Sequence, residues 1–159
     1  MYDGDVVKVI KMLKFERAKA AASPLARILC NQLPLFCEDT IIVPVPTTSS
    51  RVRQRGYNQS MLIAKHIGKE KQLKVIDALG RDSSVRQLGA SRQKRHEQIK
   101  DAFYCKKQSK VVNRDILLID DVVTTGATLK AAAKILYASG AANIYVATVA
   151  KTPPASVKQ

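Results

Sequence analysis

Aromatic residues and paired cysteines are scarce in this chain. None of its 159 residues is tryptophan, and aromatic residues make up only 5% of the sequence. Few side chains are therefore available to stack on the bases of single-stranded nucleic acid, as many single-strand-binding proteins do. The three cysteines, Cys30, Cys37 and Cys105, are odd in number and include no CxxC pair, which argues against a disulfide framework or a structural zinc site. The two histidines, His66 and His96, lie far apart, and we expect them to be solvated or packed.

Long apolar runs are also absent. The longest unbroken run spans a few residues, far short of the roughly 20 that a membrane-spanning helix needs. The N-terminus carries no signal-peptide pattern. The sequence therefore predicts a cytoplasmic protein with no membrane partner.

Acidic residues are few compared with basic ones. Lys and Arg total 27 against 13 Asp and Glu, which gives a formal net charge of +14. A field of this sign attracts nucleic acid, a phosphate-rich metabolite or an anionic membrane surface, and charge alone does not choose among them. The hydrophobic content of 46% is typical of one globular domain, which at this length buries roughly 70% of its unfolded surface.

Helical and strand-like patterns alternate along the chain. The sequence predicts helices over 5–22, 23–33, 58–72 and 128–139, and strands over 40–46, 74–76, 114–120 and 143–150. We expect Ser23 and Asn58 to cap the second and third helices, and Gly140 to end the fourth. Between the third and fourth helices, the polar, basic stretch 81–100 predicts a mobile excursion with a short helix after Ser91, and Phe103 returns to the core. This alternation predicts an α/β fold with a mainly parallel sheet.

The strongest chemical signal is the segment 116–128, in which a buried strand runs into Asp120 and Asp121 and then into a small, hydroxyl-rich turn. Ligands of doubly wound sheets bind beyond the carboxyl ends of the strands. The residues of this turn can surround a phosphate dianion at a helix N-terminus: Thr124, Thr125, Gly126, Ala127 and Thr128. The two carboxylates can accept hydrogen bonds from a ribose diol or orient a divalent cation. A generic acidic turn is the alternative. Neither GxxxxGK[ST] nor GxGxxG is present, which excludes these two nucleotide-binding motifs.

A second polar segment follows the strand over 40–46. It contains Thr47 and Thr48 and then three arginines at intervals of two, at positions 51, 53 and 55. Guanidinium groups offer fork-shaped donors to a diphosphate. The segment predicts a loop that neutralises such a group, and a solvated basic loop is the alternative.

These two segments carry a resemblance to known proteins. The segment 116–128 resembles the phosphoribosyl pyrophosphate signature of type I phosphoribosyltransferases, which consists of hydrophobic residues, two acidic residues and a small Thr/Gly loop. The residues 43–46, Arg51 and the string Arg55-Gly56-Tyr57-Asn58-Gln59 resemble the narrower ComF family, which is linked to DNA uptake in competent bacteria. Further matches extend the resemblance over nearly the whole chain.

The resemblance implies a fold and a site. It implies a type I phosphoribosyltransferase-like, Rossmann-like domain over 1–152, with a mobile hood segment, a flexible tail over 153–159 and no N-terminal zinc ribbon of the kind that many members carry. Asp120 and Asp121 would be the catalytic pair, holding the ribose diol and Mg²⁺, and Thr124–Thr128 would bind the 5-phosphate. Thr47, Thr48, Arg51 and Arg55 would face the pyrophosphate, while Arg95 would close over the site.

The implied reaction is transfer of the 5-phosphoribosyl group of phosphoribosyl pyrophosphate to a nitrogen acceptor, with release of pyrophosphate. Thr124 stands where hypoxanthine-type relatives place an aspartate base, so that activity is less expected. The alternative is a non-catalytic module that binds a phosphosugar or single-stranded DNA beside other DNA-uptake proteins. Nothing in the sequence names the acceptor.

Overall fold

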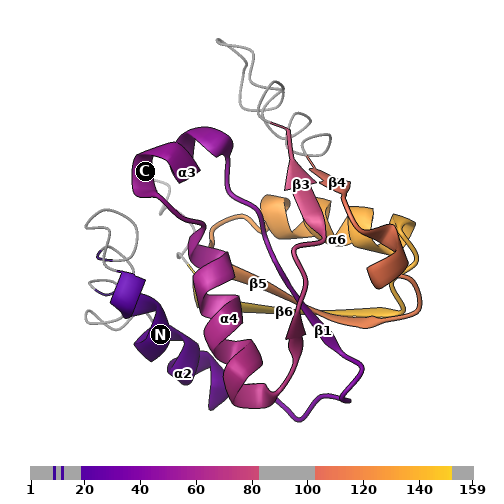
Figure 1. Cartoon of the computed structure of the whole chain (residues 1–159), viewed down its shortest axis with the longest axis horizontal. Helices are drawn as coiled ribbons and strands as arrows, with labels where there is room; N and C mark the ends of the chain where they lie inside the picture. Colours follow the sequence, from indigo (N-terminus) through magenta and orange to yellow (C-terminus); the bar gives the residue numbers. More distant parts are fainter. Residues whose placement is uncertain (1–8, 10–11, 13–18, 83–102, 152–159) are drawn as a thin grey trace, which may run out of the picture.

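The core of the protein is a four-stranded parallel sheet (Figure 1). The computed structural model describes residues 9, 12, 19–82 and 103–151. The strands lie in the order β2-β1-β5-β6, and every neighbouring pair is parallel. Their bounds are Ile41–Pro44 for β1, Lys74–Val75 for β2, Asp115–Val123 for β5 and Asn143–Lys151 for β6. The predicted α/β fold with a mainly parallel sheet is confirmed.

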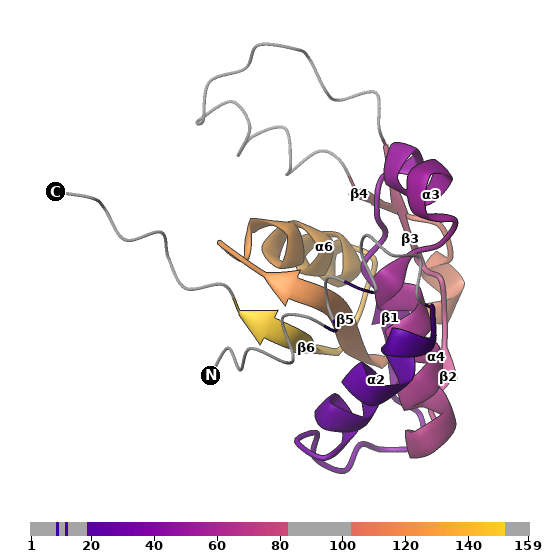
Figure 2. The ribbon, with the colours of Figure 1, turned by 90° about the vertical axis from the view of Figure 1, so that its left-hand side faces the viewer.

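Helices cover both faces of this sheet (Figure 2). Helices α2 (Ala22–Cys30) and α4 (Gln59–Lys71) pack on one face, and α6 (Ala127–Ala138) packs on the other. A short antiparallel pair, β3 (Leu79–Arg81) and β4 (Phe103–Cys105), lies on the α6 side. The remaining elements are the 3-10 turns Lys19–Ala21 and Gln108–Lys110 and the helix α3 (Ser49–Arg55).

Alternation of side chains along the central strands explains the two hydrophobic cores. Leu117 and Ile119 of β5 pack with α2 and α4, whereas Ile116 and Leu118 pack with α6. All four are at most 1% exposed, because successive side chains of a strand point to opposite faces. A continuous apolar run is therefore required in a strand that is covered on both sides.

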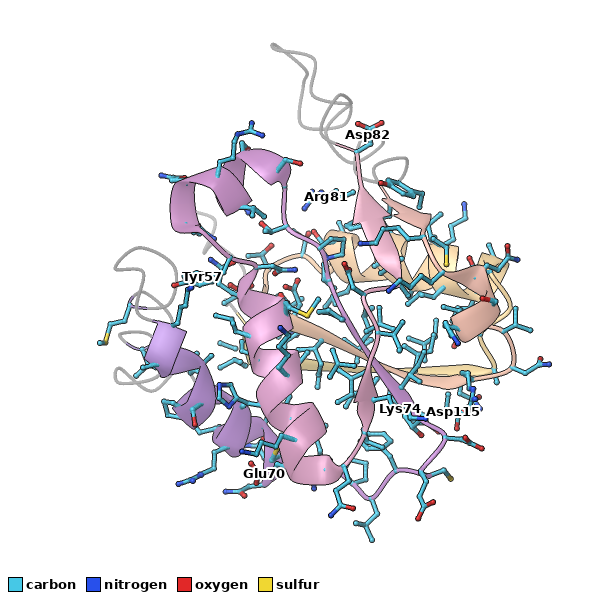
Figure 3. All side chains as sticks on the ribbon, viewed as in Figure 1. Tyr57, Glu70, Lys74, Arg81, Asp82 and Asp115 are labelled. Atoms are coloured by element: carbon cyan, nitrogen blue, oxygen red, sulfur yellow. The ribbon has the colours of Figure 1, made fainter. Side chains whose placement is uncertain are left out.

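The carboxyl ends of the strands form one edge of the molecule. Lys74 and Asp115 open β2 and β5 at the opposite edge, far from Arg81, which points from the end of β3 toward α3 (Figure 3). The loops after β1 and β5 therefore meet at the edge where α/β proteins bind ligands.

Two local predictions are confirmed at helix ends. Asn58 caps α4, and its Oδ1 accepts a hydrogen bond of 3.1 Å from the backbone N–H of Ser60. Gly140 follows α6 with φ +93°, a conformation that glycine adopts without strain. Phe103 is buried in the core beside α6, as predicted.

Other predictions are wrong in detail. Ser23 is not the cap of α2, because the 3-10 turn before it runs directly into a helix that begins at Ala22, and that helix ends at Cys30 rather than near 33. The segment 49–55 is the helix α3 instead of a loop. Strand β5 continues past Asp120 to Val123. Strand β6 is only partly buried: Ala147 is buried and four of its nine residues are exposed, because β6 is an edge strand that pairs with β5 alone among the described strands.

Several predictions lie outside the described residues. Most of the helix expected over 5–22 belongs to them, although Val9 and Met12 are helical. The greater part of the excursion over 81–100, its short helix and the tail over 153–159 also fall there. Within the described part of the chain, no helix combines the length and the apolar character that crossing a membrane requires.

Candidate functional site

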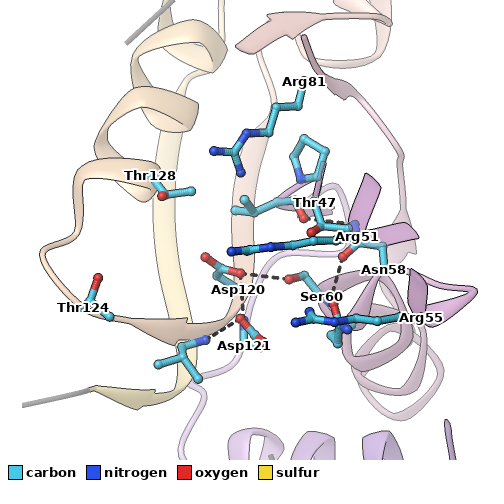
Figure 4. Close-up of a pocket in the computed structure, with 14 residues that line it drawn as sticks. Thr47, Arg51, Arg55, Asn58, Ser60, Arg81, Asp120, Asp121, Thr124 and Thr128 are labelled. Carbon is cyan, nitrogen blue, oxygen red and sulfur yellow. Dashed lines mark hydrogen bonds between the residues drawn. The ribbon is translucent and has the colours of Figure 1, made fainter. Parts of the chain in front are cut away.

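A pocket of about 400 Å³ opens at the carboxyl ends of β1 and β5 (Figure 4). Its walls come from the loop after β1, from α3, from the start of α4, from the end of β3 and from the junction of β5 with α6. The lining residues are Val45, Pro46, Thr47, Arg51, Arg55, Asn58, Gln59, Ser60, Arg81, Asp120, Asp121, Val122, Thr124 and Thr128. Segments far apart in the sequence thus supply one concave polar surface.

The acidic pair lies near the end of β5, on one wall of the pocket. Oδ1 of Asp120 accepts hydrogen bonds of 2.9 Å from the Ser60 hydroxyl and from the backbone N–H of Asp121. Oδ1 of Asp121 accepts one of 2.8 Å from the backbone N–H of Val122. These three hydrogen bonds orient the two carboxyl groups in the absence of a ligand.

Asp120 has an unusual affinity for protons. Burial, followed by the negative charge of Asp121, raises its pKa from 3.8 to about 7, while the hydrogen bond from Ser60 acts in the opposite direction. Burial disfavours the charged form of a carboxyl group, and a like charge nearby adds to this effect. Groups with such perturbed pKa values cluster at functional sites.

The turn between β5 and α6 forms the neighbouring wall. Gly126 precedes α6 with φ +77°, and Thr125 Oγ1 accepts a hydrogen bond of 3.4 Å from the backbone N–H of Ala127. Thr124 and Thr128 line the pocket, whereas Thr125, Gly126 and Ala127 form the turn without lining it. The N-terminus of a helix with this opening offers N–H groups and a positive dipole to an anion.

The two pocket-lining arginines on α3 face the acidic pair. Arg51 and Arg55 extend from this helix toward Asp120 and Asp121 (Figure 4). Residues four apart lie on the same side of a helix, which explains why Arg53 does not line the pocket. The arginines at intervals of two are therefore divided between the two sides of α3.

The two threonines before α3 have different positions. Thr47 lines the pocket. Thr48 is buried at the N-terminus of α3, where its hydroxyl lies 3.1 Å from that of Ser50. Thr48 therefore contributes to the local structure of the loop rather than to the pocket surface.

The start of α4 is hydrogen-bonded both to the end of β1 and to the acidic pair of β5. Asn58 Nδ2 donates a hydrogen bond of 3.0 Å to the carbonyl of Val45, at the exit from β1, and its Oδ1 caps the helix. Two residues on, the Ser60 side chain reaches Asp120. This part of the chain, which begins in the RGYNQ segment, thus anchors α4 to both β1 and β5.

Four polar lining residues are not among the predicted site residues. Three of them, Asn58, Gln59 and Ser60, closely follow the arginines of α3 in the sequence. This proximity is the one feature of the sequence that could have identified them as site residues. Arg81 opens the stretch expected to form a mobile excursion, yet it enters the pocket on the side of Thr128 (Figure 4). Its guanidinium carbon lies 5.1 Å from the Phe103 ring centroid. Arg95 lies outside the described residues.

The donor chemistry of the acidic wall is compatible with Mg²⁺. In the described part of the chain no group of three or more His, Cys, Asp or Glu side chains is arranged to hold a metal. Mg²⁺ is usually held by one or two carboxylates, with substrate phosphates and water completing its shell. Asp120 and Asp121 are the pair of carboxylates in the pocket that could hold it.

Similarity to known proteins extends over most of the chain. Residues 19–158 match the family model described as the phosphoribosyl transferase domain. The DNA utilization protein YhgH of Salmonella typhi is 31% identical over 154 residues, which cover 91% of this chain and 66% of that protein. Competence protein F of Haemophilus influenzae is 30% identical over 150 residues, covering 87% of this chain and 64% of that protein. The chain thus spans just under two thirds of the length of these relatives.

A solved structure supports the fold assignment. The glutamine phosphoribosylpyrophosphate amidotransferase from B. subtilis, complexed with ADP and GMP, superposes with a TM-score of 0.58 at 15% identity. The match covers 82% of this chain and 26% of that one. At this identity the similarity concerns the fold, and it agrees with the parallel sheet and flanking helices described above.

Proposed function

The chain belongs to the type I phosphoribosyltransferase family, and to its ComF branch, and from this membership and the pocket we propose that it binds phosphoribosyl pyrophosphate with Mg²⁺. We further propose that it transfers the 5-phosphoribosyl group to a nitrogen acceptor and releases pyrophosphate. One observation supports this proposal above the others: a single pocket combines an acidic pair, a helix N-terminus and guanidinium groups. Phosphoribosyl pyrophosphate carries a diol, a monophosphate and a diphosphate, which need these three kinds of partner.

Each part of the ligand has a complementary wall. Asp120 and Asp121 would accept hydrogen bonds from the two ribose hydroxyls, since ionised carboxylates are acceptors only. The turn over 124–128 would surround the 5-phosphate with N–H groups and hydroxyls. Arg51 and Arg55 would bind the diphosphate through charge-assisted hydrogen bonds.

Mg²⁺ would be held by Asp120 and Asp121 together with phosphate oxygens, and when bound it would supply positive charge beside the diphosphate. The chain's own residues would carry the rest of the chemistry. They would position the anomeric carbon and stabilise the charge that accumulates on pyrophosphate as its bond to that carbon loosens. Thr124 provides no carboxylate base in the motif, so the acceptor would lose its proton to another group or to water.

Isothermal titration calorimetry tests binding directly. Wild-type protein should bind phosphoribosyl pyrophosphate in the presence of Mg²⁺, and Asp120→Asn/Asp121→Asn should lose this binding. Asp115→Asn is a matched control, because Asp115 lies at the opposite end of the same strand and contacts Asn143; its affinity should be unchanged. Absence of binding by the wild type would reject the proposal.

A separate measurement tests catalysis. Pyrophosphate release should be followed with phosphoribosyl pyrophosphate and a panel of nitrogen nucleophiles, including free bases and amines. Release that depends on both an acceptor and the acidic pair would support transfer. Binding without release for any acceptor would favour a non-catalytic phosphosugar-binding role.

A second candidate function is binding of single-stranded DNA in DNA uptake. It is favoured by the net charge of +14 and by similarity to proteins named for DNA utilization and competence. Affinity for an oligonucleotide should then fall steeply as salt rises, because each neutralised phosphate releases counterions. A flat salt dependence would contradict this second function without affecting the first.

A further inference from the structure

Gln59 presents an unsatisfied donor at the pocket. It is the first residue of α4 and lines the pocket, yet only 3% of its surface is exposed. Its Nε2 is buried and has no hydrogen-bond partner within the described part of the chain. More than 90% of buried polar groups in folded proteins have a partner, so an orphaned amide beside a cavity indicates a group that arrives with the ligand.

The neighbours of Gln59 hold it in place. Asn58 is tied to the carbonyl of Val45 at 3.0 Å, and Ser60 is tied to Asp120 at 2.9 Å. Gln59 therefore lies between two residues whose side chains are fixed by hydrogen bonds to β1 and β5. The backbone that carries the Gln59 side chain is thus fixed at the pocket.

The charges of the surrounding walls indicate which part of the ligand Gln59 meets. The side formed by α3 carries Arg51 and Arg55, which attract the most anionic group. The acidic pair occupies the wall formed by β5 and suits the diol. An amide N–H adds directional donation to an anionic oxygen without adding a further charge.

We propose that Gln59 is a specificity residue whose Nε2 donates a hydrogen bond to a diphosphate oxygen, so that the site selects sugar phosphates that carry a 1-diphosphate. This inference rests on the proposed function. It assigns to Gln59 the discrimination between phosphoribosyl pyrophosphate and ribose 5-phosphate. A site built to donate to a particular oxygen rejects the analogue that lacks it, because the buried donor is then left unpaired.

The test compares three ligands on Gln59→Met, a substitution that keeps an unbranched side chain of similar length and removes the donor. Calorimetry with Mg²⁺ should show a loss of affinity of roughly 5- to 30-fold for phosphoribosyl pyrophosphate and for inorganic pyrophosphate. Affinity for ribose 5-phosphate should change by less than about twofold. Gln32→Met is the matched control, since Gln32 is exposed outside the pocket, and it should change none of the three affinities.

Thermal unfolding without ligand separates a binding role from a structural one. Because Nε2 has no hydrogen-bond partner among the residues that the structure describes, Gln59→Met should melt at the same temperature as the wild type or higher. Gln59→Glu, which replaces the donor with an acceptor, should lose affinity for both diphosphates more severely and provides a second variant if the methionine disturbs folding.

The binding measurements distinguish failure of the Gln59 assignment from failure of the proposed function. Unchanged affinity for the diphosphates in both variants would overturn the inference while leaving the proposed function intact. An equal loss for ribose 5-phosphate would also overturn it and would move the contact to the sugar or the 5-phosphate. If folded wild-type protein binds neither diphosphate, the proposed function fails, and the assignment of Gln59 fails with it.

Discussion

The Ser60 hydroxyl donates a hydrogen bond of 2.9 Å to Oδ1 of Asp120, although 60 positions separate the two residues in the sequence. The bond joins the first turn of α4 to the end of β5. It makes the segment before α4 and the acidic pair two parts of one site, since Asn58 ties the same turn to β1. The stretch of sequence that resembles the ComF family therefore carries the two pocket arginines, and the serine that directly follows it supports Asp120.

Loss of this bond should weaken ligand binding. In Ser60→Ala, the pKa of Asp120 should rise further, because the Ser60 hydrogen bond lowers it, and the carboxyl group should be less firmly oriented. Affinity for phosphoribosyl pyrophosphate should fall about fivefold, the equivalent of about 1 kcal/mol. Calorimetry near neutral pH measures this, with Ser109→Ala, an exposed serine outside the pocket, as the control. An unchanged affinity would show that the hydrogen bond from Ser60 does not orient the Asp120 carboxylate for ligand binding.

The raised pKa of Asp120 predicts how stability depends on pH in protein free of metal and ligand. Its pKa is 3.8 in the unfolded chain and about 7 in the fold, so the folded state binds more protons between these values. Stability therefore falls as pH rises through this window and levels off above it.

Asp120→Asn tests this directly, because the amide cannot ionise and its oxygen still accepts hydrogen bonds. Its free energy of unfolding should be flatter over this range and should exceed that of the wild type at pH 8 by about 1–3 kcal/mol. Urea titrations between pH 4.5 and 8.5 measure both. Parallel pH profiles for the two proteins would contradict the raised pKa.

Because Arg51 and Arg55 line the pocket and Arg53 does not, substituting these arginines should weaken pyrophosphate binding to different extents. Arg51→Met and Arg55→Met should each weaken pyrophosphate binding by roughly 10- to 100-fold, because each removes charge-assisted hydrogen bonds to phosphate. Arg53→Met removes the same charge from the same helix but lies away from the pocket, so its effect should be less than about threefold. Titration of inorganic pyrophosphate into each variant is the measurement. Equal losses in all three would mean that net charge, not geometry, governs binding.

Two glycines at opposite ends of α6 form a matched pair. Gly126 and Gly140 have φ of +77° and +93°, and at either position alanine costs about 1 kcal/mol of stability through the backbone conformation; at Gly140 its Cβ would also lie 3.2 Å from Cγ2 of Val112. Only Gly126 belongs to the turn proposed to bind the 5-phosphate. Gly126→Ala should therefore weaken ribose 5-phosphate binding several-fold, whereas Gly140→Ala should lower the melting temperature alone. If Gly140→Ala also lost affinity for ribose 5-phosphate, the weaker binding of Gly126→Ala would be explained by reduced stability and not by the turn.

Much of the fold could be predicted from local patterns. The apolar run 116–119 indicates a strand covered on both faces, and Asn58 has the short polar side chain that a helix N-terminus favours. Asp120, Asp121 and Thr124 follow a buried apolar run, and the ends of parallel strands meet at one edge of the sheet. Hence the acidic pair and the turn after it could be located from the order of residues alone.

The remaining features depend on tertiary structure. Helix α3 has no buried residue, so it lacks the apolar periodicity that identifies helices in a sequence. Strand β6 has the composition of a central strand, and its exposure follows from its place in the sheet order. Arg81 reaches the pocket because β3 pairs with β4, whose residues begin at Phe103, a pairing that no local pattern encodes.

The central claim is that one pocket receives the diol, the 5-phosphate and the diphosphate of a single ligand on three different walls. A crystal structure of the wild-type protein with phosphoribosyl pyrophosphate and Mg²⁺ tests it most directly. The account predicts the ribose hydroxyls on Asp120 and Asp121, the 5-phosphate in the turn over 124–128, and the diphosphate between Arg51 and Arg55. A ligand bound outside this pocket, or one with its diphosphate in the turn, would contradict it.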